Sequence, residues 1–163
     1  MGSFKNKGME SVKEMQESSR ETTDLGSEMQ NQAEQINQVL DGINLQDDED
    51  ISAVSDTKGS YQKSFDSAFS EQVETAGQEI ESQSEQLRSE ISAEQGNVRS
   101  GIQSMERASG VSEIGRDAAD AGRSKLEQSE REYEGIAGDA ERVADDTSKK
   151  IEQLKNNVNR IFG

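Results

Sequence analysis

Carboxylates are the residues of this sequence that could do chemistry. The 163 residues include 34 Asp and Glu against 18 Lys and Arg, and neither His nor Cys occurs. Without His the commonest general base and metal ligand is missing, and without Cys there is no thiol chemistry and no disulfide. A catalytic carboxyl group needs an apolar pocket that raises its pKa. Because the acids here alternate with apolar stripes of helical spacing, we expect them on solvated faces and predict a protein that is not an enzyme.

The densest acidic cluster is the run from Asp47 to Asp50. A calcium loop of the EF-hand type alternates its acidic ligands around a central Gly, and this run does neither. Acids directly before an apolar pattern suit the N-terminus of a helix, whose dipole favours negative charge. The Gly-containing stretches 96–101 and 135–138 do not lead into the Gly-Lys-Ser/Thr of a phosphate loop. The sequence therefore predicts a helix cap, no metal site and no cofactor.

The composition favours long helices over a layered globular fold. Pro is absent, aromatic residues make up 4% of the chain, and hydrophobic residues make up 29%. That is little for a compact core but enough for a narrow seam, because a coiled coil needs about two apolar residues in seven. The net charge of −16 argues against nucleic acid and anionic membranes, and favours solubility or a basic partner.

Membrane insertion and a secretory leader are not indicated by the sequence. No apolar stretch approaches the roughly 20 residues that span a bilayer, so we expect no integral membrane segment. The N-terminus lacks the apolar run of a cleaved signal peptide. We expect a cytoplasmic protein or one exported without a cleaved signal peptide, and the missing Cys leaves the redox compartment open.

The first helix is expected from about residue 9 to residue 40, after a flexible N-terminus at 1–8. Steps of three and four residues define a heptad seam at Val12, Met15, Ser19, Thr22, Gly26, Met29, Ala33, Ile36, Leu40 and Ile43. Leu40, Asp41 and Gly42 then form the expected turn, with Gly42 available for a left-handed C-cap. The turn region extends over residues 41–50 and leads into a second helix, which predicts a helical hairpin over 9–108.

The second helix, over about 48–108, shows an eleven-residue period. Such a repeat corresponds to about 3.67 residues per turn and gives a nearly straight stripe. The expected partner-packing stripe consists of Val54, Tyr61, Phe65, Phe69, Ile80, Leu87, Ile91, Val98 and Ile102. We expect the kink of this helix at Gly96-Asn97. Either helices of the same chain cover the stripe or a partner chain does, and both interpretations remain open.

Tyr61, Phe65 and Phe69 are the densest aromatic cluster and are spaced four residues apart. We expect them to form the hairpin core against Ile36, Leu40 and Ile43, with anchoring of a partner as the alternative. The remaining segment, 109–163, predicts a third long helix that folds back on the second. The predicted fold is therefore all-α, an elongated helical hairpin or three-helix bundle with coiled-coil packing.

Residues 9–95 resemble the helical hairpins of the WXG/LXG group, small proteins exported by type VII secretion. The shared features are the acidic, Gln- and Ser-rich composition, the two long helices and Leu40-Asp41-Gly42 at the turn. The export signal of that group, Tyr followed four residues later by Asp or Glu, is not matched, because Phe65 follows Tyr61 and Ala137 follows Tyr133 at that spacing. The resemblance implies a secreted substrate or a partner protein, and the missing signal favours the partner.

Residues 118–150 resemble the group 3 late-embryogenesis-abundant proteins in their Gly, Ala, Glu, Lys and Asp content and eleven-residue period. That resemblance implies a stress-protective hydrophilin that becomes ordered conditionally. Our leading prediction is helix-mediated protein–protein interaction in a bacterial secretion or assembly system, through apolar stripes that face a second copy or a second helical protein. The hydrophilin and a self-assembling filament or shell subunit are the alternatives.

Overall fold

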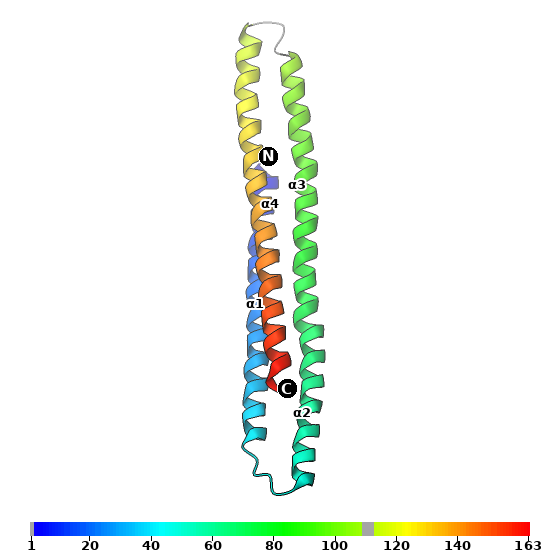
Figure 1. Ribbon diagram of the computed structural model, residues 1–163. Coiled ribbons are helices and arrows are strands. Elements are labelled where there is room, and N and C mark those ends of the chain that lie inside the picture. Colours follow the sequence, from blue (N-terminus) through cyan, green and yellow to red (C-terminus); the bar gives the residue numbers. More distant parts are fainter. Residues whose placement is uncertain (1, 109–112) are drawn as a thin grey trace. The chain divides into compact units, whose positions relative to one another are not determined.

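The computed structural model describes residues 2–108 and 113–163, and these are almost entirely helical (Figure 1). Helix α1 spans Gly2–Asp41, α2 spans Asp48–Phe69, α3 spans Thr75–Ala108 and α4 spans Glu113–Ile161. A π-helical turn, η1 (Ser70–Glu74), joins α2 to α3 with helical backbone angles at both junctions. The described residues contain no strand, which confirms the all-α prediction.

Helix α1 begins earlier than the sequence analysis expects. It starts at Gly2, so residues 2–8 are helical and do not form a flexible N-terminus. The ring of Phe4 meets that of Tyr133 in α4 edge-on, with centroids 5.3 Å apart, and Lys5 Nζ lies 3.0 Å from a carboxylate oxygen of Glu132. These two contacts with α4 explain why the first turns are ordered.

The turn between α1 and α2 is closed by local hydrogen bonds. The backbone N–H of Gly42 donates to the carbonyls of Gln38 and Val39 at 3.0 and 3.2 Å. No described residue has a positive φ, so the expected left-handed C-cap at Gly42 is not formed. At the start of α2, Asp47 Oδ1 accepts from the Asp50 N–H at 2.9 Å, and Asp50 Oδ2 accepts from the Gln46 N–H at 3.1 Å. The acidic run thus caps the helix, as predicted.

The irregularity in the second helical run lies at η1, and α3 continues as α-helix through Gly96 and Gly101. Apolar residues recur every fourth position from Tyr61 through Phe65 and Phe69 to Val73. Steps of four exceed the roughly 3.6 residues of an α-helical turn, so the apolar face drifts around the helix. A wider π turn at this point reduces that drift.

The chain divides into two compact units: unit 1 contains parts of α1, α3 and α4, and unit 2 contains parts of all four α-helices together with η1. Unit 1 comprises residues 1–15 and 82–143, and unit 2 comprises residues 16–81 and 144–163. In unit 1, the beginning of α4 runs antiparallel to the end of α3: Arg123 approaches Glu106 at 3.6 Å, and Arg99 contacts Glu130 at 2.9 Å. The fold-back expected for the third helix is present in this unit.

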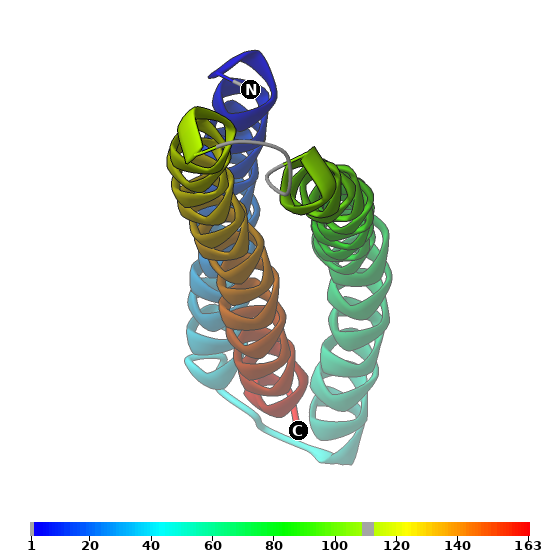
Figure 2. The same cartoon turned by 90° about the horizontal axis from the view of Figure 1, so that it is seen from above.

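In unit 2, the end of α4 lies beside both α1 and the helical run α2–η1–α3 (Figure 2). Ser19 Oγ shares a hydrogen bond with Thr147 Oγ1, and Asn157 donates to Gln30 at 3.3 Å, so α4 and α1 are parallel here. The buried cluster of this unit consists of Met29, Phe69, Val73, Ile151, Leu154 and Val158. Helices α1, α2 and α4 and the π-helical turn η1 each contribute to this core.

Candidate partner-binding surface

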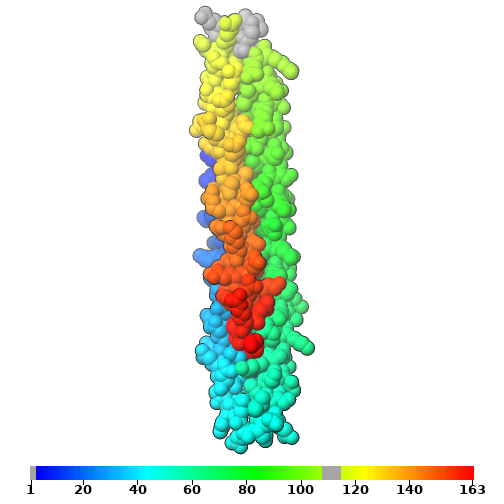
Figure 3. Space-filling model, viewed as in Figure 1, coloured from blue at the N-terminus to red at the C-terminus, as the bar shows by residue number. Residues whose placement is uncertain are grey.

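The surface of interest lies at the hairpin end of unit 2, where α1 turns into α2. Phe162, directly after the end of α4, stacks on Tyr61 and Phe65 with centroid distances of 6.0 and 5.9 Å. Residues 35–41 of α1 and 48–57 of α2 lie closer to the turn than these contacts do. Figures 1 and 3 show this part of the hairpin (cyan to teal) continuing past the end of α4.

A groove of about 380 Å³ opens between α1 and α2 at this level. It is lined by Gln35, Ile36, Val39, Leu40, Thr57 and Tyr61. Leu40 is buried and Ile36 is half-buried, so the floor of the groove is apolar. Val39, at its edge, is 69% exposed. The groove has the composition that an apolar side chain from another helix would need.

Exposed apolar side chains are concentrated in the segment that carries this groove, and two of them, Val39 and Tyr61, line it. Of the six large hydrophobic residues that are exposed in the described part of the chain, five fall between residues 39 and 61. These five, which we call the hairpin-end patch, are Val39, Ile43, Leu45, Ile51 and Tyr61. The sixth, Met9, belongs to unit 1. Single exposed hydrophobic residues are ordinary on protein surfaces, whereas large contiguous apolar patches are typical of interaction sites and ligand-binding grooves.

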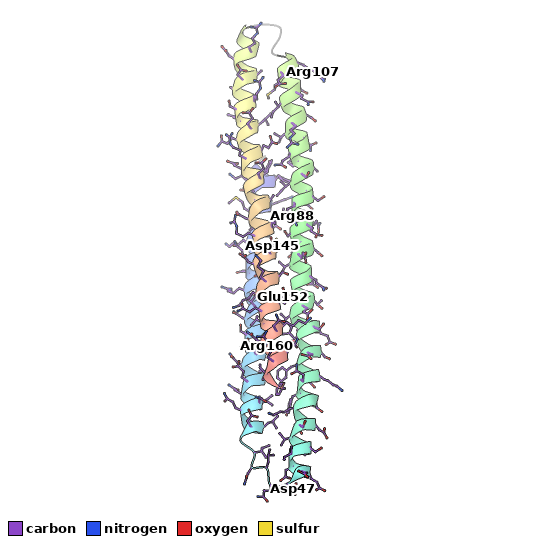
Figure 4. All side chains as sticks on the ribbon, in the orientation of Figure 1. Asp47, Arg88, Arg107, Asp145, Glu152 and Arg160 are labelled. Atoms are coloured by element: carbon purple, nitrogen blue, oxygen red, sulfur yellow. The ribbon has the colours of Figure 1, made fainter. Side chains whose placement is uncertain are left out.

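The hairpin-end patch is surrounded by negative charge. Residues 34–58 contain seven carboxylates, with Lys58 as the single basic residue of that segment. Lys58 is itself engaged in an ion pair with Asp41. Figure 4 places Asp47 at this end of the hairpin.

The nine residues of the predicted stripe differ in their degree of burial. Phe69, Ile80, Leu87, Ile91 and Val98 are buried, Val54, Phe65 and Ile102 are half-buried, and Tyr61 is exposed. The members from Val54 to Ile80 belong to unit 2, and those from Leu87 to Ile102 belong to unit 1. Of the three turn residues, Leu40 is buried while Asp41 and Gly42 are exposed.

The aromatic cluster packs differently from the expectation. Tyr61 and Phe65 contact Phe162, which follows the last residue of α4, and Phe69 joins the buried cluster of unit 2. Ile43, which we expected in the hairpin core, is 44% exposed because it lies beyond the end of α1. The expected core of the hairpin is therefore corrected: α4 supplies the apolar cover for Phe65 and Phe69.

Tyr133 is a core residue that the sequence analysis does not single out. Its side chain is buried against Phe4, and its hydroxyl has no hydrogen-bond partner among the described residues. Burial raises the pKa of the phenol; Glu94 and Glu132 raise it further, and Lys5 lowers it. The signal for this position is its spacing, because Tyr133, Ile136 and Ala140 follow one another at helical intervals and all three are buried.

Among the described residues, no group of three or more acidic side chains is arranged to hold a metal ion. None of the helices there is apolar enough over a sufficient length to cross a membrane.

The fold and the surface define a class of protein. It is an all-α protein of bundled long helices, and its hairpin end carries an apolar groove surrounded by acidic residues. No family model, no curated protein and no solved structure matches this chain.

Proposed function

We propose that this protein is a non-enzymatic module for helix-mediated protein–protein interaction, and that the hairpin-end patch is its binding surface. The observation that carries the proposal is an apolar groove lined in part by two exposed hydrophobic residues, Val39 and Tyr61, in a segment that holds three more. Exposing such residues to water costs free energy that burial against a partner recovers, at roughly 25 cal/mol for each Å² of apolar surface.

The burial of the long stripe supports placing the interaction at the hairpin end. Most of the stripe faces other helices of the same chain, so it serves the folding core of its unit. A partner that used Phe69 or Ile91 would first have to displace an internal helix. The hairpin-end patch is exposed without any such rearrangement.

As its biological setting we propose a bacterial secretion or assembly system of the type VII kind, in which this chain is the partner of a second helical protein. The α1–α2 hairpin, with Leu40-Asp41-Gly42 at its turn, supports this setting. The absence of the Tyr-based export signal favours the partner role over that of an independently exported substrate. A partner protein carrying the signal would be needed if the complex is exported.

The test is photocrosslinking in the native cells from two matched positions. A photoreactive amino acid at Val39 should give one discrete adduct with another protein, and the same amino acid at Met9 should give none. Both positions are exposed hydrophobic residues of α1, and only Val39 lies in the patch. Adding Ile51→Asp should abolish the Val39 adduct. Equal adducts at both positions, or none at either, would contradict the proposal.

The two alternative functions are separated by circular dichroism and light scattering on the isolated chain at micromolar concentration. The proposed module should be highly helical, melt cooperatively and have a small, defined mass. A largely unstructured chain in buffer would favour the conditionally ordered hydrophilin. Very large assemblies would favour the filament or shell subunit.

A further inference from the structure

The structure also indicates what kind of partner the hairpin-end groove accepts, an inference that rests on the proposed function. We propose that the groove binds an amphipathic helix with an apolar stripe and Lys or Arg beside it, placed against α1 and α2 as the end of α4 is placed in the rest of unit 2.

Helix α4 already provides an example of such a helix. Residues 149–160 contain the four basic residues Lys149, Lys150, Lys155 and Arg160 and one acid, Glu152. Their apolar side is buried in the unit: Ile151, Leu154 and Val158 are 7, 4 and 1% exposed. Lys155 Nζ lies 3.1 Å from an oxygen of Glu74 in η1. The α1–α2 side of unit 2 thus accommodates a basic amphipathic helix along part of its length.

The groove is continuous with the surface of α1 and α2 on which α4 packs. Tyr61 stacks on Phe162 at the end of α4, with an angle of 16° between the rings, and Tyr61 also lines the groove. The groove therefore begins where the contacts of α4 end. Figure 3 shows the hairpin end (cyan) continuing past the end of α4 (red) on the face that is drawn. A helix placed there would continue an existing mode of packing.

The negative charge of the hairpin end favours a basic partner. The segment that carries the groove has seven carboxylates and one lysine, and that lysine is paired with Asp41. A second copy presenting the same end would bring like charges together, which disfavours association. A helix flanked by Lys or Arg gains attraction from these carboxylates and accelerates its own encounter with the groove. Charge complementarity therefore selects a basic helix over a second copy.

The test uses a fluorescent synthetic peptide with the sequence of residues 149–163, added to the full-length protein and followed by fluorescence anisotropy. Binding should be saturable and weaken with added salt. Val39→Lys should weaken it by about tenfold or more, because the change removes an apolar contact and repels the peptide. Met9→Lys is the matched control, with the same change of charge at an exposed position of unit 1, and should leave the affinity unchanged.

The composition of the peptide provides the second control. A scrambled peptide, with its apolar residues spread around the helix, should bind at least about tenfold more weakly, because it lacks one apolar face. Equal binding of both peptides would show that charge alone holds the peptide, and this would overturn the proposal. Binding that Val39→Lys does not alter would also overturn it, because the peptide would then be replacing α4.

Two further outcomes separate this inference from the proposed function. If the peptide does not bind but the Val39 adduct forms in cells, the basic helix is the wrong occupant and the binding surface stands. If light scattering gives a dimer that Val39→Lys dissociates, a second copy occupies the groove, which overturns the inference. Circular dichroism of both variants checks that they remain folded.

Discussion

The ring of Phe162 lies nearly parallel to that of Tyr61, at 16° and with centroids 6.0 Å apart. A second ring, Phe65, lies 5.9 Å from Phe162, so the end of α4 is held by two aromatic residues of α2. This contact joins the beginning of the second helical run to the last residues of the chain, and it marks the border between the covered and the open part of the hairpin.

Phe162→Ala should lower the free energy of unfolding by about 1–3 kcal/mol, because it removes two ring contacts and a half-buried side chain. Urea denaturation followed by circular dichroism measures this change. The control is Leu45→Ala, another hydrophobic truncation in unit 2, at a residue that is 45% exposed in the turn. A similar loss in both variants would show that the aromatic contact contributes nothing specific.

Gly26→Ala and Gly59→Ala should have opposite effects, although both place Ala in a helix of unit 2. A Cβ at Gly59 meets no atom within 4 Å, so Gly59→Ala should stabilise the protein by up to about 1 kcal/mol. A Cβ at Gly26 would lie 2.9 Å from Leu154 Cδ1 and 3.4 Å from Phe69 Cε2. That crowding costs about 1–3 kcal/mol and outweighs the helix gain. Thermal and urea denaturation measure the stability of both variants. A stabilised Gly26→Ala variant would refute the close packing of Leu154 and Phe69 against Gly26.

Ser84→Ala should stabilise the protein by about 1 kcal/mol. Ser84 is fully buried in unit 1, and its hydroxyl has no partner among the described residues. Removing an unsatisfied hydroxyl relieves its desolvation cost, and Ala is also the better helix former. Thr147→Ala is the comparison, since it removes the hydroxyl that bonds Ser19 and should lower stability. Both are read from urea denaturation midpoints, and a destabilised Ser84→Ala variant would mean that the hydroxyl has a partner.

Tyr133 should make stability decrease at alkaline pH. Burial raises its pKa above the ordinary 10.0, so the folded state holds the proton more tightly than the unfolded chain does. The stabilisation is complete below about pH 10 and is lost as the pH rises through the folded-state pKa. Urea denaturation on either side of pH 10 should therefore show a smaller decrease in Tyr133→Phe than in the native chain. Tyr61→Phe, at the other tyrosine of the chain, is the control and should not reduce the decrease.

The absorbance of the phenolate gives an independent reading of the same property. The chain has two tyrosines and no tryptophan, so each tyrosine can be removed in turn. Tyr133→Phe should remove the component that titrates at the higher pH. If the same component persists in this variant and disappears in Tyr61→Phe, the assignment of the raised pKa to Tyr133 is wrong.

Local features of the fold could be predicted from the sequence alone. The absence of Pro and the spacing of apolar residues indicate long helices, and Asp47 before an acidic first turn indicates a cap. The heptad seam of the first helix also predicts burial well: Val12, Met15, Met29 and Ala33 are buried as the pattern requires. These properties depend on residues a few positions apart in the sequence, and the spacing of apolar residues shows which of them share one side of a helix.

What covers each stripe was decided by the tertiary structure. The sequence indicates that Tyr61, Phe65 and Phe69 share an apolar side, but not that Phe162, about a hundred residues later, packs on two of them. Nor does it indicate that Tyr133 pairs with Phe4, or that Val39 and Ile51 stay exposed. A helical period gives the direction in which a side chain points, whereas its cover depends on the register of helices distant in sequence. That register is set by side-chain fit in three dimensions.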